Sequence, residues 1–491
     1  MAAQSTADIG GLTRPSGQLD AGTALSPYSG QLGERRAAHL LRRAGFGGSP
    51  DEVRRFAAMP ASDAVESLMR FPSTANLPQQ PDYIFDGATV VQKYGPLRNL
   101  SPDELKLART EIHQGLYRTR VSMQTWWLNR MLQTPAPLQE KMAFFFHGHF
   151  TSGLGVKGTS AYEMLGQLQL FRNYALGNLR ELTRAVARDP AMLRYLDGAA
   201  NVAAHPNENF ARELMELFTL GVDHYTENDV RESARAWTGW KYGPRIGVRF
   251  DPNDHDWGSK TFLGQTGNFN GDDIVNIIYS QPQCSRFLAT WLLNGFVYNN
   301  PEPELVEGVA AMLRRNDYDL APVMSTLLRS NVFYSDRAYR ALVKSPVEFV
   351  VGAHKALGLS KISEDAVPAI ASMGQVLLDP PNVAGWPGGE NWITSGTLIS
   401  RQNYLARLID SQTVADSAWL GQLPMHPRDA AGRLVSALLQ GDAAPASVFS
   451  VEAMLDGAGT TALAKLSAEN FGERVSGAAY LTMSMPAFQL G

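Results

Sequence analysis

Apolar residues recur at intervals of three or four positions along most of the chain, and this spacing predicts α-helices. The segments "LYRTRVSMQTWWLNRML" (residues 116–132) and "NLRELTRAVARD" (residues 178–189) show the pattern clearly. Runs in which apolar and polar residues alternate are scarce, so few strands are expected. The pattern therefore predicts a mainly α fold: one large multi-helical domain with two irregular loop or hairpin insertions.

Residues that favour helix N-termini stand in front of several helical segments. "SPDEL" from Ser101 and "SPDEV" from Ser49 combine a hydroxyl N-cap, a proline in the first turn and a glutamate three positions after the serine. This is a capping box, in which the two side chains satisfy backbone N–H groups that a helix leaves unpaired. Thr226 and the pair Asp189–Pro190 are weaker start signals.

Two segments break the helical pattern. In "GVRFDPNDHDWGSKTFLG" (residues 247–264), Val248 and Phe250 on one side and residues 261–263 on the other are the best strand candidates. They predict an irregular hairpin or an excursion of the chain. "DPPNVAGWPGGENW" (residues 379–392) is rich in glycine and proline and predicts the second insertion.

The chain shows no exact repeat at a fixed period, so a regular solenoid is not expected. We predict a flexible N-terminal arm over residues 1–33, because this part is small, polar and rich in glycine and proline. A motif-bearing helical half over residues 34–265 and a second half of the same unit over residues 266–420 follow it. Residues 421–491 are expected to form a C-terminal helical segment. The boundaries fall near Gly267–Gly271 and near Gly421–Pro424.

Composition narrows the protein class. The 491 residues are 44% hydrophobic and 19% charged, as in ordinary soluble globular proteins. A formal net charge of −4 gives no basic surface, so nucleic acid is not an expected partner. One cysteine, Cys284, excludes an intrachain disulfide and a cysteine-based metal cluster. No apolar run is long enough to cross a membrane, and the N-terminus does not read as a signal peptide, so the cytoplasm is the default location.

The first polar segment is "NENFARELMELFTLG" (residues 207–221). On a helix that starts near Asn207, Glu208, Arg212 and Glu216 share one edge, with Asn209 and Glu213 beside them. One interpretation is a solvated face with an ordinary Glu208–Arg212 ion pair. The other is a buried carboxylate cluster whose members are split into an acid and a base.

The second polar segment is "FFFHGHF", with His147 and His149 two positions apart. On a regular helix they point about 200° apart, so they share a ligand only if the chain leaves the helix at Gly148. In that case two imidazoles at this spacing suit a divalent metal. The alternative is one core histidine and one exposed histidine.

The third polar segment, "NDHDWG", places Asp254, His255 and Asp256 in a loop. Such side chains ligate metals or move protons, although Asn and Asp also simply favour turns. Trp386 and Trp392 in the second insertion are either exposed planes that stack on sugar rings or anchors that hold the loop to the core. Motifs for serine hydrolases, phosphate-binding loops, dinucleotide-binding folds and HExxH metalloproteases are missing.

An ordered series of segments resembles one bacterial family, the domain of unknown function numbered 1800. The resemblance covers about His39 to Leu490 and implies a mainly helical unit from a bacterium, with no activity to carry over. Members of that family often carry a leader peptide, which implies export as the alternative location. The residues that fall in its signature segments are His147, His149, Glu208, Asn209, Arg212, Glu213, His255 and Asp256. The segments are "HLLRRAGFGGSPDEV", "FFFHGHF", "NENFARELMELFTLGVDHYTENDVRESARAWTGW", "HDWGSKTFLG", "VKSPVEFVVGAHKALG", "LLDPPNVAGWPGGENWI" and "YLTMSMPAFQL".

These observations give three hypotheses. The first is a hydrolase of a polar polymer, a glycan, or of a small-molecule substrate. Its acid is Glu208 or Glu213, its base or nucleophile is Asp254 or Asp256, Arg212 holds a carboxylate ionised, and Asn209, Trp386 and Trp392 bind substrate. The second is a divalent-metal hydrolase with His147, His149 and His255 as ligands and Glu208 or Asp256 completing the shell. The third is a non-catalytic helical scaffold that binds a protein partner.

Overall fold

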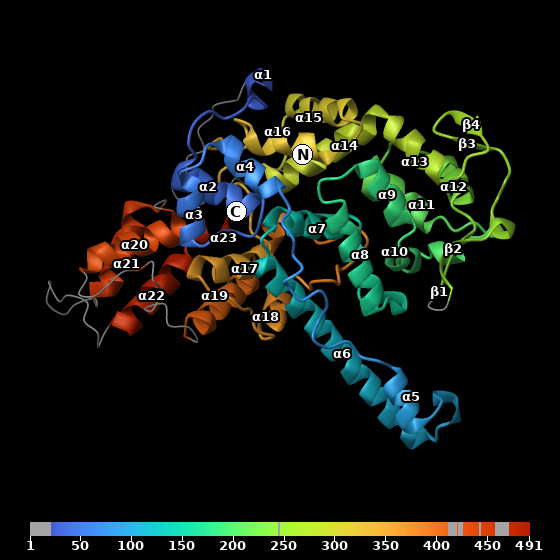
Figure 1. Cartoon of the computed structure of the whole chain (residues 1–491), viewed down its shortest axis with the longest axis horizontal. Helices are drawn as coiled ribbons and strands as arrows, with labels where there is room; N and C mark the ends of the chain where they lie inside the picture. Colours follow the sequence, from blue (N-terminus) through green and yellow to red (C-terminus); the bar gives the residue numbers. More distant parts are fainter. Residues whose placement is uncertain (1–20, 244–245, 411–419, 421–425, 441–442, 457–470) are drawn as a thin grey trace.

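The structure is a computed structural model that describes residues 21–243, 246–410, 420, 426–440, 443–456 and 471–491. It confirms the mainly α fold, because helices make up nearly all regular structure and the only sheets among these residues are two small ones (Figure 1). Buried apolar side chains from helices along the whole described chain form the core. Among the described residues, no helix combines the length and the apolar character that a bilayer crossing requires.

The helices of the first third include one that is much longer than the others. They are α1 (Ala21–Ala24), α2 (Gly33–Arg43), α3 (Pro50–Ala57), α4 (Ala61–Met69), α5 (Ala88–Tyr94), the 3-10 helix η1 (Leu97–Asn99), α6 (Pro102–Gln133) and α7 (Pro137–His149).

The middle of the chain has shorter helices and all of the strands. Its helices are η2 (Val156–Gly158), α8 (Ala161–Asn173), α9 (Leu179–Ala187), α10 (Pro190–Tyr195), η3 (Gly198–Ala200), α11 (Asn209–Glu213), the π-helix η4 (Leu214–Thr219), α12 (Glu227–Ala236) and η5 (Pro252–Asp254). Its strands are β1 (Trp240–Gly243), β2 (Gly247–Phe250), β3 (Lys260–Phe262) and β4 (Gln265–Gly267).

The remaining helices complete the body and form a cluster at one end of it (Figure 1). They are α13 (Gly271–Ser280), α14 (Pro282–Phe296), α15 (Pro303–Arg315), α16 (Leu320–Arg329), α17 (Pro346–Leu357), α18 (Ala366–Ser372), η6 (Gly389–Trp392), α19 (Ser395–Asp410), α20 (Pro427–Leu439), α21 (Pro445–Asp456), α22 (Phe471–Ser484) and α23 (Pro486–Gln489).

The helix starts expected from the sequence are confirmed. Capping boxes begin α3 at Ser49, α6 at Ser101 and α12 at Thr226, with both reciprocal hydrogen bonds present in each. Asp189 caps α10 by accepting a hydrogen bond from the Met192 N–H at 3.0 Å. Local side-chain chemistry therefore fixes these four boundaries.

Helix α6 has 32 residues and is about 48 Å long at ~1.5 Å per residue. Its N-terminal half extends away from the body together with α5 (Figure 1). Leu107, Leu116 and Tyr117 are exposed on this half, whereas Met123 and Trp127 in the C-terminal half are fully buried. The helix is thus a core element at one end and an arm at the other.

The first insertion contains two separate antiparallel pairs instead of one hairpin. Strand β2 pairs with β1, and β3 pairs with β4, so the two predicted flanks do not pair with each other. Residues 251–259 between them form the predicted excursion. The chain returns past Gly239, whose φ is +92°. A Cβ on this residue would lie 2.8 Å from the Asp251 carbonyl oxygen, so the close approach leaves room for glycine only.

The second insertion packs against the end of α7. A Cβ on Gly385 would collide with the Gly148 carbonyl oxygen, so this close approach requires glycine. Helix α13 begins at Gly271, at the proposed boundary of the two halves, and packs against α9 and α12 of the first half. The boundary at Gly421–Pro424 and residues 1–20 of the predicted arm lie outside the described residues.

Candidate functional site

The first polar segment folds as α11 followed directly by the π-helix η4. Arg212, near the end of α11, forms an ion pair with Glu208 at 3.2 Å, as the sequence predicts. The same guanidinium forms two hydrogen bonds to Glu227 at the start of α12, at 2.7 and 2.8 Å. Arg212 therefore joins two helices through exposed or half-exposed carboxylates.

The π-helix changes the direction of the residues that follow Glu213. A wider turn rotates them away from the positions that a regular α-helix would give. Glu216 lies within this π-helix and accepts a hydrogen bond from the Tyr225 hydroxyl. Burial and this bond raise the pKa of Tyr225, and Arg212 acts in the opposite direction. The ion pair confirms the predicted proximity of Glu208 and Arg212, and the placement of Glu216 on the same edge stays a prediction.

Glu213 stands at the junction of α11 and η4 and differs from its acidic neighbours. It is half-buried, and within the described chain its carboxylate has no ion pair or hydrogen bond. Burial, and next the charge of Glu216, raise its pKa above the ordinary glutamate value, while Arg212 acts in the opposite direction. The raised pKa is what a general acid needs.

A second carboxylate, Asp379, lies near the same place. Tyr195, the last residue of α10, has a pKa raised by burial and then by the charges of Asp379 and Glu213. Asp379 forms an ion pair with Arg120 of α6 at 2.5 Å. The charges of Glu213, in the first polar segment, and of Asp379, in the second insertion, thus both raise the pKa of Tyr195. Neither Tyr195 nor Asp379 was a sequence candidate, although Asp379 opens the insertion "DPPNVAGWPGGENW".

Asn209, the first residue of α11, contacts the segment that follows α10. Its amide donates a hydrogen bond to Asp197 at 3.0 Å, and Asp197 forms an ion pair with Lys157 at 2.5 Å. Asp197 thus contacts both Asn209 and Lys157, which fixes the start of α11 against the segment after α10.

The second polar segment stays helical, since α7 runs as far as His149. His147 is fully buried between Trp127 and Trp386, with ring centroids 5.5 and 5.4 Å away, and neither ring nitrogen has a partner. Burial lowers the pKa of His147 to about 3. His149 lies 3.0 Å from the Phe218 carbonyl oxygen and stacks on Trp291, and burial lowers its pKa to about 4. Both histidines are therefore neutral at pH 7, with His147 inside the core and His149 partly buried at the end of α7.

The third polar segment is held by its own contacts. His255 Nδ1 lies 2.8 Å from the Thr238 carbonyl oxygen. Asp256 accepts two hydrogen bonds from Arg235, and Asp254 forms an ion pair with Lys241 at 2.8 Å.

The three polar segments do not assemble a metal-ligand cluster in the part of the chain that the structure describes. There, no three His, Cys, Asp or Glu side chains come together in an arrangement that holds a metal ion. His147, His149 and His255 have three separate environments. His147 and His149 are separated because the helix continues through Gly148, so the two imidazoles point in different directions and contact different neighbours.

Of the tryptophans that the sequence offers as sugar platforms, Trp392 is buried and Trp386 stacks on Phe144. Both therefore have the anchoring role that the sequence left open as the alternative. Trp257 of the third segment is 63% exposed. Its ring is fixed by a hydrogen bond from Nε1 to the Pro252 carbonyl oxygen at 3.0 Å and by edge contact with His255.

Comparison with known proteins identifies a family. The family model described as "Protein of unknown function (DUF1800)" matches residues 39–490. No curated protein and no solved structure matches the chain. The match therefore covers all of the residues discussed above, and the site has to be interpreted from its own chemistry.

Proposed function

This chain belongs to the DUF1800 family, whose function is unknown, and we propose that it is a hydrolase that cleaves a polar polymer, a glycan, by carboxylate acid–base chemistry. The proposed general acid is Glu213. The observation that carries the proposal is the state of this side chain: half-buried, without an ion pair in the described chain, and with a raised pKa. A carboxyl group in this state holds its proton closer to neutral pH than an exposed glutamate does.

Asp379 is the proposed partner. Its carboxylate forms an ion pair with Arg120 at 2.5 Å. Its charge, like that of Glu213, raises the pKa of Tyr195. In the proposed reaction Glu213 gives its proton to the bridging oxygen as the bond to carbon breaks. Asp379 takes a proton from the attacking water, so one water is consumed and two hydroxyl groups are formed.

The backbone around Glu213 supports the assignment. Single π-helical turns inside α-helices are rare and occur frequently at functional sites. Here the π-helix begins at Leu214, directly after Glu213. Trp257, with its fixed and exposed ring, is the better candidate to stack on a sugar than Trp386 or Trp392.

The other sequence candidates remain alternatives for the same chemistry. Glu208, Asp254 and Asp256 each form an ion pair with an arginine or a lysine. Of these three, Asp256 has a pKa held below the ordinary aspartate value, first by its hydrogen bond from Arg235, which suits a base better than an acid.

A test compares Glu213→Gln with Glu208→Gln, its matched control in the same segment. Wild-type protein is assayed for release of reducing ends from a panel of soluble and insoluble polysaccharides, peptidoglycan included, between pH 4 and 8. We expect release from at least one polymer, a kcat lowered about 100-fold or more in Glu213→Gln, as for loss of a general acid, and little change in Glu208→Gln. No release by folded wild-type protein, or full activity of Glu213→Gln, would overturn the proposal.

A non-catalytic scaffold is the second candidate, and the ion pairs of Arg212 and Arg235 favour it. Each of these arginines joins α12 to another segment. A scaffold predicts that Glu213→Gln, folded at pH 7, complements a gene deletion strain as fully as the wild-type chain does. The metal-dependent hydrolase remains a prediction from the sequence, and metal content after purification without chelator tests it.

A further inference from the structure

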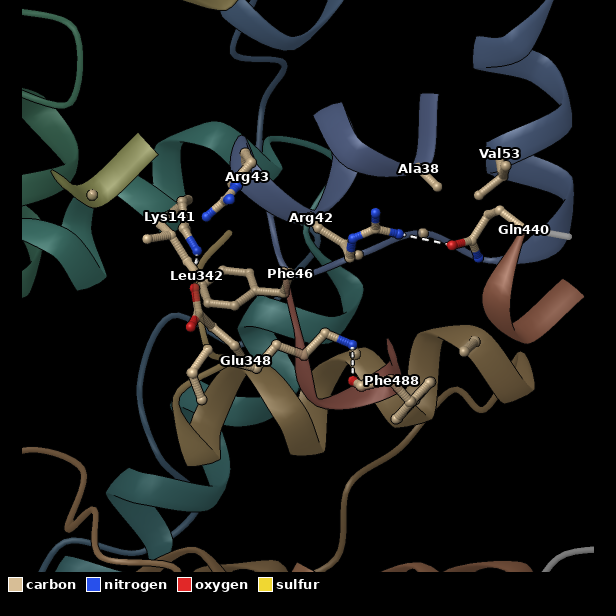
Figure 2. Close-up of a pocket in the computed structure, with 18 of the residues that line it drawn as sticks. Ala38, Arg42, Arg43, Phe46, Val53, Lys141, Leu342, Glu348, Gln440 and Phe488 are labelled. Atoms are coloured by element: carbon tan, nitrogen blue, oxygen red, sulfur yellow. Dashed lines mark hydrogen bonds and ion pairs between the residues drawn. The ribbon is translucent and has the colours of Figure 1, made fainter. Parts of the chain in front are cut away.

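The cavity of about 160 Å³ between α2, α7, α17 and the C-terminal helices α20 and α23 has charged side chains whose partners lie within the protein (Figure 2). Lys141 forms an ion pair with Glu348, and Arg42 donates a hydrogen bond to Gln440 at 2.8 Å. A cavity whose charges have partners in the chain requires no ligand. Recognition chemistry without such partners lies instead on the surface of the first insertion.

Phe250 and Trp257 form an exposed aromatic corner in that insertion. Phe250, at the end of β2, is 38% exposed, and Trp257 in the following loop is 63% exposed. Their ring centroids are 6.4 Å apart and their planes meet at 89°, so one ring stands as a wall beside the other. The Trp257 N–H is already bonded to the Pro252 carbonyl oxygen, which leaves the exposed apolar surface of the indole for a ligand.

His255 borders the aromatic corner and supplies a polar atom to it. The side chain is 6% exposed, and its ring centroid lies 4.6 Å from that of Trp257 and 5.2 Å from that of Phe250. Its Nδ1 lies 2.8 Å from the Thr238 carbonyl oxygen. Because a carbonyl oxygen only accepts, Nδ1 carries the proton, and Nε2 of the neutral ring is an acceptor. Within the described chain Nε2 has no hydrogen-bond partner, and unlike both nitrogens of His147 it is not enclosed.

The loop that carries Trp257 is fixed by buried contacts. Lys260 is 1% exposed, and its ammonium group donates hydrogen bonds to the carbonyl oxygens of Asp256 and Gly258 at 2.6 and 2.9 Å. Arg235 of α12 bonds the carboxylate of the same aspartate. A loop that is ordered in advance loses little conformational entropy when a ligand binds.

The charged residues next to the three rings in the chain are each paired with an opposite charge. The pairs are Arg249–Asp251, Lys241–Asp254 and Arg235–Asp256. Neither sign is in excess among these side chains, so the aromatic corner suits an uncharged ligand.

A pyranose ring of a neutral sugar matches these features. One face of the ring presents C–H bonds, which pack on an aromatic plane. Hydroxyl groups stand around its edge and donate hydrogen bonds to an acceptor such as His255 Nε2. An apolar peptide side chain would also cover the two rings, but it offers no donor to this nitrogen.

We propose that the aromatic corner and His255 form a binding subsite for one uncharged pyranose unit of a polysaccharide, whose C–H face lies on Trp257 and one of whose hydroxyl groups donates to His255 Nε2. The choice of a polysaccharide rests on the proposed function. Binding at the subsite needs none of the groups around Glu213.

Helix α12 separates the subsite from the proposed general acid. Glu227 at its start bonds Arg212, the neighbour of Glu213, whereas Arg235 near its end bonds Asp256. Glu227 and Arg235 lie about 12 Å apart along the helix axis at ~1.5 Å per residue. The subsite therefore holds the polymer at a distance from the bond that is cleaved.

The test is isothermal titration of the full chain, with Glu213→Gln in the background to prevent cleavage. The probes are the neutral sugars chitohexaose, cellohexaose, xylohexaose and maltohexaose, with hexagalacturonate as the charged comparison. We expect saturable binding of at least one neutral probe and weaker binding of hexagalacturonate.

Trp257→Ala should weaken that binding about tenfold or more, and Trp257→Phe should restore part of it, because a second aromatic plane still packs on the sugar. His255→Phe keeps a ring and removes Nε2, so it should also weaken binding, with its fold checked by thermal unfolding. Tyr117→Ala is the matched control, because this tyrosine of α6 is 66% exposed and lies outside the first insertion. It should leave binding unchanged.

Absence of binding of every neutral probe by folded protein, or equal binding by Trp257→Ala, would overturn the proposal. Trp257-dependent fluorescence of the apolar dye Nile red, without binding of any sugar, would assign the corner to an apolar protein partner and would overturn it too.

Failure of the subsite and failure of the hydrolase give different results. Trp257-dependent binding without release of reducing ends by the wild-type chain supports the subsite and overturns the hydrolase. Release of reducing ends with a KM that Trp257→Ala leaves unchanged supports the hydrolase and overturns the subsite.

Discussion

Arg235 donates two hydrogen bonds to Asp256, from Nε at 2.7 Å and from Nη2 at 3.1 Å, and so joins the loop after β2 to α12. Both side chains are partly buried. Charge-assisted hydrogen bonds of this kind contribute more than exposed ion pairs do.

Asp256→Asn should lower the free energy of unfolding by about 1–3 kcal/mol, the range for hydrogen bonds to charged groups. Arg235 is also the main reason that the pKa of Asp256 lies below the usual aspartate value. The stability that the ionised Asp256 contributes is therefore fully present above the unfolded aspartate pKa of ~3.9 and is lost as pH falls below it. Urea unfolding should show a gap between wild type and variant at pH 6 that narrows below pH 4. Asp336→Asn, in an exposed pair with Arg35, should change stability by less than about 1 kcal/mol at either pH.

The effect of Glu213→Gln on the free energy of unfolding should depend on pH in the opposite sense to the effect of Asp256→Asn. The folded pKa of Glu213 is raised, so the favourable contribution of the protonated group is present below the unfolded pKa of ~4.3 and is lost as pH rises through the folded pKa. Relative to the glutamine variant, the wild type should therefore lose stability as pH rises above about 4. Denaturant titrations at four pH values measure this difference. A difference that does not depend on pH would contradict the buried, unpaired state of Glu213.

Glu140→Gln should be strongly destabilising. Glu140 is fully buried between Arg130 and Arg172, which bond its Oε1 at 2.5 and 2.7 Å. Loss of the carboxylate leaves two buried guanidinium groups without a counter-charge, at about 3–5 kcal/mol.

The chain contains a matched control for this triad. Glu307 also lies between two arginines, Arg286 and Arg314, at 2.8 and 2.6 Å, but its side chain is 44% exposed. Glu307→Gln should lower the free energy of unfolding far less than Glu140→Gln does, because solvent screens the exposed pair. Equal losses of unfolding free energy in Glu140→Gln and Glu307→Gln would show that burial does not determine how much such a carboxylate stabilises the fold.

His147→Phe should be tolerated at pH 7 and should protect against acid. The imidazole is buried without a hydrogen-bond partner, so a ring of similar shape removes an unsatisfied polar group. Its folded pKa of about 3 lies below the unfolded value of ~6.5, so the wild type loses stability as pH falls through this interval. The variant should lose less between pH 6.5 and 4. A variant that is unfolded at pH 7 would indicate a bound group at the ring nitrogens and would revive the metal hypothesis.

The sequence predicts the parts of the fold that depend on neighbouring residues. Capping boxes at Ser49, Ser101 and Thr226 act over three positions, so they can be read directly from the chain. The π-helix could not be predicted, because its start at Leu214 depends on how both sides of the segment pack in the core.

The candidate site was less predictable than the fold, because its contacts join distant residues. Arg120 and Asp379 are 259 positions apart, and no local pattern indicates that they meet. Glu213 was a sequence candidate together with Glu208, yet only the burial and ion pairs of the folded chain distinguish them.

The position of helix α6, with one half in the core and the other outside the body, has a mechanical consequence. Because its base is fixed among buried tryptophans and its far half lies outside the body, it acts as a lever. A small rotation at the base displaces the tip with α5 by a much larger distance. Whatever touches that tip therefore exerts torque on the helix that carries Arg120, and so on the contact between this arginine and Asp379.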